Sequence, residues 1–258
     1  MERPIKCKLP RRENFVVKYK MSNLLKEICN KMTNTTASPV FTDDTLTLYH
    51  GDMTMIKTLS FDYVITDPPY NCAYKYPDYN DRMKPDDYVK MLSHLKDYKT
   101  ILIHYSEAFC GVIRDAIGIP NKLIPWVYNS NLGKQHRMIG WYNSKPDLRR
   151  VKQPYKNPTD KRIKKLIAEG SQGTRLYDWW NINLIKNVSK QKVSSFTNQI
   201  PIEVLERIIL TTTNEGDTIL DPFFGSGSLY FACKNTGRKC IGIEQSLKHI
   251  GSFYERKD

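Results

Sequence analysis

The sequence lacks the long hydrophobic segments of membrane proteins and the leader segment of secreted proteins. No apolar run approaches the roughly eighteen residues that a membrane span needs. Residues 1–12 are basic and polar throughout, whereas a secretory signal is charged and then apolar. We therefore expect a soluble, cytoplasmic protein that has no membrane partner.

Cysteine and histidine are sparse and scattered. The six cysteines include no C-x-x-C pair, and the five histidines form no cluster at the spacing of metal ligands. The sequence therefore predicts neither a disulfide framework nor a metal site.

A glycine segment near the carboxyl end lacks one glycine of the dinucleotide fingerprint. The apolar run 218–220 predicts a strand, 223–227 a tight loop and 228–235 a helix whose amides point at the loop. The fingerprint G-x-G-x-x-G would need glycine at position 230, which is Tyr230, so hydride transfer is disfavoured. Glu244 ends the next predicted strand, where a carboxylate can bind a ribose diol. Together the loop and Glu244 favour an adenosine-bearing ligand.

The remaining pattern is typical of an α/β protein. With 258 residues and 40% hydrophobic content, we expect one main domain with room for an appended lobe. Short apolar runs alternate with helical stretches, which predicts a Rossmann-like, mostly parallel sheet with helices on both faces. Strands are expected at 45–49, 63–66, 100–105, 123–128, 218–220 and 240–243, and helices at 85–95, 107–117 capped by Ser106, 202–212, 228–235 and the carboxyl end.

The net charge of +13 is concentrated in two segments. Residues 1–36 hold nine Lys and Arg against three acids, and residues 130–192 hold fifteen against four. In the second segment Trp141, Tyr142, Tyr155, Tyr177, Trp179 and Trp180 are interleaved with the basic residues, where they could stack on bases or pack the lobe. A nucleic-acid surface is favoured there over a merely solubilising one. The candidate nucleic-acid-binding residues are Lys134, Arg137, Arg149, Arg150, Lys152, Lys156, Lys161, Arg162, Lys164 and Lys165.

These patterns divide the chain into four parts. We expect a basic extension at 1–36, with a short helix capped by Ser22 that carries Leu24, Leu25, Ile28 and Met32 on one face. Residues 37–129 and 193–258 form two halves of one domain. A basic lobe at 130–192, with a helix near 160–168, is inserted between them.

The tetrapeptide Asp67-Pro68-Pro69-Tyr70 follows a predicted strand at the edge of the sheet where ligands bind. An amino group on an aromatic base is a poor nucleophile, because its lone pair is delocalised into the ring. Asp67 and the carbonyl of Pro68 can accept its two hydrogens, the prolines restrict the turn, and Tyr70 offers a face for stacking. A Pro-Pro turn on its own is at least as often a structural turn as a catalytic one, but its position after this strand favours a catalytic role.

In combination these segments resemble the beta group of S-adenosylmethionine-dependent DNA amino-methyltransferases. The tetrapeptide precedes Asp221-Pro222-Phe223-Phe224-Gly225-Ser226-Gly227 and a target-recognition region lies between, which is the order of that group. The resemblance implies that Asp67 to Tyr70 are catalytic and that Asp52, Asp67, Gln199, Asp221, Phe223, Gly225, Ser226, Gly227 and Glu244 bind S-adenosylmethionine. Phe196 and Ile200 replace a usual His and Lys, so one cationic contact to the cofactor is missing there.

The resemblance implies methylation of adenine N6 in duplex DNA after the base is flipped out. Asp at the first motif position leans toward adenine, while cytosine N4 stays open. An RNA adenine methyltransferase is disfavoured by Tyr70 and by the glycine loop. The intact Asp67 and Tyr70 argue against a non-catalytic DNA-binding subunit that retains the fold, but the altered motif around Phe196 keeps this alternative open. A homodimer and a cognate restriction endonuclease remain open as partners.

Overall fold

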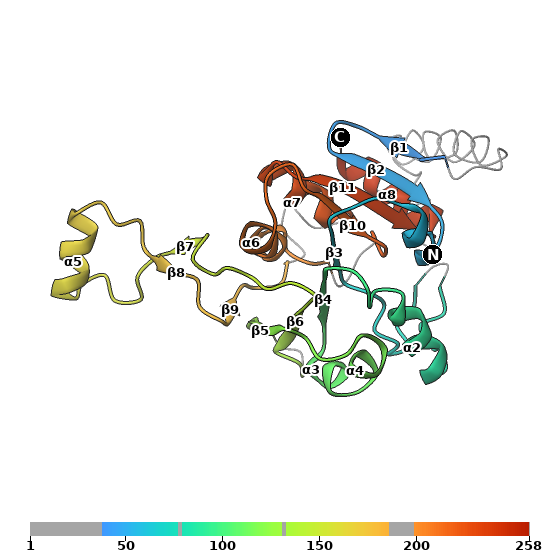
Figure 1. The fold of residues 1–258 in the computed structure, drawn as a ribbon, viewed down its shortest axis with the longest axis horizontal. Coiled ribbons are helices and arrows are strands. Elements are labelled where there is room, and N and C mark those ends of the chain that lie inside the picture. The colour runs from blue at the N-terminus through green and yellow to red at the C-terminus, as the bar shows by residue number, and fades with distance from the viewer. Residues whose placement is uncertain (1–37, 77–78, 131–132, 186–198, 258) are drawn as a thin grey trace, which may run out of the picture.

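A twisted, mostly parallel sheet forms the centre of the molecule (Figure 1). The computed structural model describes residues 38–76, 79–130, 133–185 and 199–257, so the predicted extension at 1–36 and its helix lie outside the described residues. In the described part the sheet has nine strands in the order β1-β2-β11-β10-β3-β4-β6-β5-β9. Their bounds are β1 Phe41–Thr42, β2 Leu46–His50, β3 Tyr63–Thr66, β4 Thr100–His104, β5 Lys122–Val127, β6 His136–Tyr142, β9 Trp180–Asn181, β10 Thr218–Asp221 and β11 Lys239–Glu244.

Five adjacent strands, β2, β11, β10, β3 and β4, run parallel. The carboxyl ends of parallel strands meet at one edge of a sheet, so the residues after β3 and β10 are neighbours. The order also explains how distant segments meet, because β10 pairs with β3 along the register Ile219↔Tyr63. The mostly parallel α/β fold predicted from the sequence is confirmed.

Helices cover both faces of the sheet, because the central strands bury side chains on both sides. Along β4, Ile101 and Ile103 join one hydrophobic cluster and Leu102 joins the other. The first cluster packs under α6 Ile202–Thr212, α7 Ser228–Thr236 and α8 Leu247–Lys257. The second packs under η1 Met53–Thr58, α2 Pro85–Ser93, α3 Ser106–Cys110 and α4 Val112–Ile117.

The helix predicted at 107–117 is broken in two. α3 ends at Cys110 and α4 begins at Val112, with Gly111 between them at φ −123° and ψ −109°. Ser106, expected as the cap, is the first helical residue, and its hydroxyl donates to the carboxylate of Glu107. The helical pattern was correct here, but Gly111 interrupts the helix. Glycine has no side chain, so it adopts this non-helical conformation without a steric clash.

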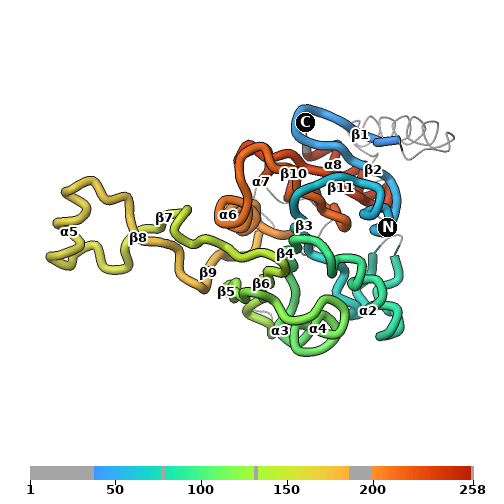
Figure 2. Tube along the Cα trace, in the orientation of Figure 1, coloured from blue at the N-terminus to red at the C-terminus, as the bar shows by residue number. Residues whose placement is uncertain are grey.

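The segment predicted as a lobe at 130–192 is partly sheet. β6 lies antiparallel between β4 and β5, and β9 pairs with β5, so both ends of the segment belong to the core. Between them the chain runs out along an arm and returns, as the tube in Figure 2 traces. The arm consists of a two-stranded ribbon, β7 Lys152–Gln153 with β8 Thr174–Arg175, and α5 Lys161–Ala168 at its tip. Residues 131–132 and 186–192 of the predicted lobe lie outside the described residues.

α5 has none of its residues buried, and its side chains extend from the tip of the arm. Asp160 caps it by accepting from the amides of Arg162 and Ile163 at 2.9 and 3.2 Å. Local capping and helix propensity therefore account for this helix. None of the helices in the described ranges combines the length and hydrophobicity that a membrane span requires.

Candidate functional site

A cavity of about 720 Å³ opens at the carboxyl edge of the parallel strands. Its walls include residues that follow β2, β3, β10 and β11, which parallel pairing brings to one edge. The sequence-predicted residues that line it are Asp52, Asp67, Pro68, Pro69, Tyr70, Gln199, Asp221, Phe223, Gly225, Ser226 and Glu244. The two motifs, far apart in the sequence, thus face the same space.

Asp67 stands at the tip of β3 with 24% of its side chain exposed to the cavity. Its carboxylate accepts a hydrogen bond from the hydroxyl of Tyr70 and lies 3.4 Å from Nη1 of Arg137. Burial raises the pKa of Asp67, and both partners oppose that rise because they favour the charged form. The carboxylate is therefore already surrounded by donors.

The ring of Tyr70 is held against β4. It stacks on His104 at 4.0 Å between centroids, with 29° between the planes, and meets the edge of Tyr105 at 4.7 Å. Sequence reasoning expected this ring to offer a face to a substrate base. The structure shows that His104 covers one face, a contact that no local motif announced.

A hydrogen-bond chain fixes the second proline of the turn. Nδ1 of His104 accepts from the amide of Tyr105 at 2.8 Å, and burial lowers the pKa of His104 to about 4, so the ring is neutral at neutral pH. Its Nε2 must then donate to the hydroxyl of Tyr88, 3.1 Å away, which itself donates to the carbonyl of Pro69 at 2.7 Å. Tyr88 and His104 thereby set the orientation of the turn, while nothing among the described residues donates to the Pro68 carbonyl.

The glycine loop is tied to the end of β11. The amide of Gly225 donates to Oε2 of Glu244 at 2.8 Å, and the amide of Ser246 donates to Oε1 at 2.8 Å. Gly225 adopts φ 51°, a left-handed conformation that favours glycine. Glu244 consequently shapes the loop as well as lining the cavity.

Gly227 does not line the cavity, unlike the other residues predicted to bind a cofactor. It adopts φ 71°, and a Cβ there would lie 2.5 Å from Cδ2 of Phe253 on α8. The glycine is required by close packing of the loop on a helix. Sequence spacing alone does not separate a glycine that contacts a ligand from one that contacts the core.

Asp52 and Asp221 occupy different environments. Asp52 is exposed and caps η1, with Oδ1 accepting from the amide of Thr54 at 2.7 Å. Asp221 is buried and accepts from the Thr66 hydroxyl at 2.7 Å and the Phe223 amide at 3.0 Å. Burial is the main cause that raises the pKa of Asp221 to about 7. The negative charges of Asp67 and Glu244 act in the same direction.

The loop 71–83, whose residues 77 and 78 lie outside the described part, forms one wall of the cavity. Asp81 is buried and accepts from the amides of Asn71, Cys72 and Tyr74 at 2.8, 3.0 and 2.9 Å. Asn71 adopts φ 53°, which helps aim these amides at a single carboxylate. The loop carries the cavity-lining rings of Tyr74, Tyr76 and Tyr79. Sequence reasoning missed Asp81, because it follows no recognisable motif.

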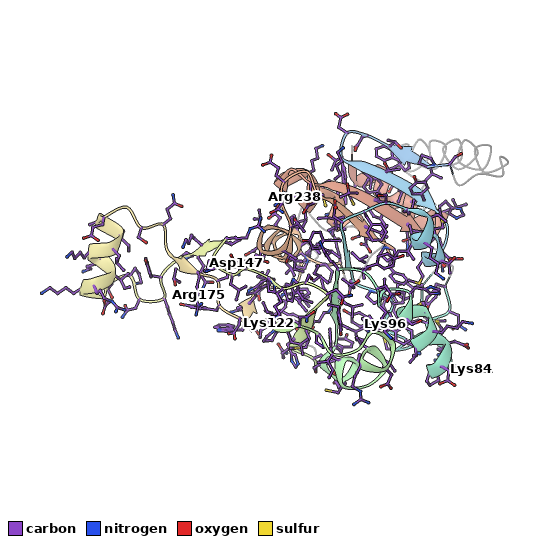
Figure 3. The ribbon with its side chains drawn as sticks, viewed as in Figure 1. Lys84, Lys96, Lys122, Asp147, Arg175 and Arg238 are labelled. Atoms are coloured by element: carbon purple, nitrogen blue, oxygen red, sulfur yellow. The ribbon has the colours of Figure 1, made fainter. Side chains whose placement is uncertain are left out.

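Most candidate DNA-binding residues lie exposed on the arm, namely Lys152, Lys156, Lys161, Arg162, Lys164 and Lys165. Figure 3 shows Arg175 on the arm and Asp147 where the arm leaves the sheet domain. Arg149, also exposed, pairs with Asp147 at 2.9 Å, and Arg150 donates to the carbonyl of Thr213 after α6. Lys134 pairs with Glu107, away from the arm.

Arg137 requires a correction, because it is not a surface residue. It is only 3% exposed, lies on β6 within the sheet and lines the cavity beside Asp67. The interleaved aromatics also divide. Trp141, Tyr142 and Trp180 are buried in the core, whereas Tyr177 and Trp179 stay exposed at 36% and 48% and stack at 6.3 Å.

No three His, Cys, Asp or Glu side chains of the described residues gather as a metal site would require. The chemistry that the arrangement offers is hydrogen-bond acceptance at Asp67 and Pro68, next to a cavity rich in carboxylates. Such a cavity suits a cationic ligand beside a polar aromatic one.

Comparison with known proteins agrees with this chemistry. A family model described as DNA methylase, of the N6 and N4 type, matches residues 61–255. Among curated proteins, the chain is similar to the type II methyltransferase M.HpaI of Haemophilus parainfluenzae, at 30% identity over 77% of this chain and 68% of the relative. It is also similar to the type II methyltransferase M.BglII of Bacillus subtilis, at 27% identity over 81% of this chain and 68% of the relative.

Solved structures share the fold. The PvuII DNA methyltransferase, described as cytosine-N4-specific, superposes with a TM-score of 0.59 at 17% identity, covering 86% of this chain and 90% of that one. The M1.HpyAVI–SAM complex superposes with a TM-score of 0.51 at 20% identity, covering 83% and 100%. The architecture is therefore the class I methyltransferase fold.

Proposed function

The chain belongs to the N6/N4 DNA methylase family, and on that premise we propose that it transfers a methyl group from S-adenosylmethionine to the exocyclic N6 of adenine in duplex DNA. One observation carries the proposal. The turn 67–70 and residues 223–226 of the glycine loop line one cavity, and the Thr66 hydroxyl joins their strands by its bond to Asp221.

The residues present fit S-adenosylmethionine. The cavity of about 720 Å³ lies within the usual range for a ligand site, roughly 300 to 1,000 Å³. Asp67 and Glu244 bring negative charge into it, and these charges add to the rise in the pKa of Asp221. A cationic ligand offsets that repulsion. Asp52 and Glu244 supply acceptors for adenosine, and Phe223 supplies an apolar surface.

When bound, S-adenosylmethionine supplies an electrophilic methyl on a sulfonium, whose C–S bond breaks with its electron pair left on sulfur. Asp67 and the Pro68 carbonyl accept the two amino hydrogens of the target base, which frees the nitrogen lone pair to form the new N–C bond. Asp67 then accepts the proton that the methylated nitrogen releases. Preorganised acceptors of this kind contribute by positioning and electrostatics, with no covalent enzyme intermediate.

Asp67 supports adenine over cytosine as the target base, because Asp at the first position of the motif that residues 67–70 resemble is typical of adenine methyltransferases. The exposed cations of the arm support contact with the DNA backbone, and the stacked pair Tyr177 and Trp179 supports contact with a base or sugar. Arginine and lysine side chains on a projecting arm can reach DNA phosphates without a contact between the DNA and the hydrophobic core of the sheet domain. We assign target recognition to the arm between β6 and β9.

The decisive experiment identifies the methylated base. The protein is incubated with unmethylated duplex DNA and methyl-labelled S-adenosylmethionine, and the DNA is digested to nucleosides for mass spectrometry. We expect N6-methyladenine. N4-methylcytosine would change the assigned base, and the absence of label from DNA despite cofactor binding would contradict methyl transfer. An RNA of the same sequence serves as control and should stay unlabelled.

A further inference from the structure

Arg137 is buried inside the sheet domain, where a cation is costly. It lies near the start of β6, and alternation along that strand places it on the side of Ile139 and Trp141, which are both fully buried. Arginine in such a place is stable only when its charge is compensated. The groups around the Arg137 guanidinium therefore identify the charge that compensates it.

Three aromatic rings and one carboxylate surround the guanidinium. Its carbon lies 5.3 Å from the ring centre of Tyr70, 5.4 Å from Trp126 and 6.0 Å from Tyr105. The carboxylate is Asp67, whose Oδ2 lies 3.4 Å from Nη1. These contacts hold the guanidinium among the rings, with Nη1 beside the carboxylate.

The chemistry of the proposed function requires Asp67 to be an anion, because a protonated carboxyl loses acceptor capacity toward the amino hydrogens. Burial acts against that form, since it raises the pKa of Asp67. The titratable groups around it are Tyr70, Tyr76, Tyr88 and Asp221, which are neutral or negative, and Arg137. Arg137 is the cation, among the described residues, whose charge lowers the pKa of Asp67.

We propose that Arg137 is a positioning residue of the active site, which holds Asp67 as a carboxylate anion at the edge of the cavity. The inference rests on the proposed function, because it assigns a task to the same carboxylate. In this interpretation the rings of Tyr70, Tyr105 and Trp126 hold the guanidinium of Arg137 close to Asp67. Among the described residues, the Nε of Arg137 has no hydrogen-bond partner, and Asp67 is the carboxylate that pairs with this buried charge.

The first test is the pH profile of methyl transfer, measured in single turnovers with saturating cofactor and DNA. Arg137→Met and Arg137→Gln should move the acid limb to higher pH by about one to three units, the usual effect of an adjacent cation on a carboxyl. Arg137→Lys should restore the limb toward that of the wild type. Arg238→Met removes another buried arginine, bonded to Thr213, and should leave the limb in place. A lower rate with an unmoved limb in both neutral variants would overturn the proposal.

The second test does not depend on activity. Urea unfolding is compared for the wild type, Arg137→Gln, Asp67→Asn and the double variant at pH 7. Arg137→Gln should lower the unfolding midpoint clearly more in the presence of Asp67 than in its absence, because only then is a buried carboxylate left uncompensated. Additive shifts would overturn the proposal. If the wild type methylates no DNA, the proposed function fails, but this cycle still reports on the pair.

Discussion

The hydroxyl of Thr66, the last residue of β3, donates to the carboxylate of Asp221, the last residue of β10, at 2.7 Å. The two strands are adjacent and parallel, so this bond connects the points at which the turn 67–70 and the glycine loop begin. Both residues are buried. The relative position of the two motifs therefore depends on one polar contact as well as on strand pairing.

Replacing Asp221 should remove a pH-dependent loss of stability. Burial, opposed by the bonds from Thr66 and Phe223, raises the pKa of Asp221 from 3.8 to about 7. The folded protein thus binds this proton more tightly than the unfolded chain does. The stabilisation of the folded state by the bound proton is therefore fully present below about pH 4 and is lost as the pH rises through about 7. Relative to Asp221→Asn, the wild type should lose on the order of a few kcal/mol between about pH 4 and 8 in urea unfolding. Parallel stability curves for the two proteins would contradict the assignment.

Asp67→Ala should abolish methyl transfer to duplex DNA, because the principal acceptor for the amino hydrogens is removed. Affinity for S-adenosylmethionine should stay within about tenfold, or roughly 1.4 kcal/mol, as measured by calorimetry. Asp44→Ala, which removes an exposed acid outside the cavity, is the control and should retain activity. Full transfer by the Asp67 variant would refute the amino-group chemistry.

Asp81→Ala should loosen the wall formed by loop 71–83. Three partly buried backbone amides lose their acceptor, and a hydrogen bond to a charged group contributes about 1.5 to 3 kcal/mol, less where water replaces it. Hydrogen exchange at residues 71, 72 and 74 should accelerate, and methyl transfer should fall. Asp81→Asn keeps one acceptor oxygen and should lie between the two. Exchange at the wild-type rate in the alanine variant would show that Asp81 does not hold the loop.

Neutralising α5 should weaken DNA binding and its dependence on salt. Lys164→Gln with Lys165→Gln removes two exposed charges at the tip of the arm, which should reduce the slope of log affinity against log salt by about one to two. Lys84→Gln with Lys96→Gln removes two charges from the opposite side of the molecule (Figure 3) and should leave the slope unchanged. Equal slopes in both double variants would move the DNA footprint away from the arm.

The regular parts of the fold could be predicted where local pattern and environment agree. The apolar run 63–66 and the helical pattern 202–212 match β3 and α6 residue for residue, because both segments are buried as their patterns require. The meeting of Asp67 with the glycine loop followed from strand topology, which brings parallel strand ends to one edge.

The errors share a physical cause. β6 was read as lobe, because it begins with the polar residues His136 and Arg137 and pairs with partners distant in the sequence. Arg137 was assigned to DNA, because a count of charges does not reveal which way a side chain points. Asp81 and His104 act through backbone groups and rings that the fold assembles, so no local signal could identify them.

The architecture of the arm affects how this protein can diverge. α5 buries none of its residues, and the ribbon beneath it consists of two residue pairs, so few tertiary contacts constrain the sequence of the tip. Substitutions there leave the sheet and its cavity undisturbed. Under the proposed assignment of target recognition to the arm, selection can alter which DNA sites are modified independently of the residues that line the cavity. Grafting the tip from a homologue is then a practical route to altered specificity.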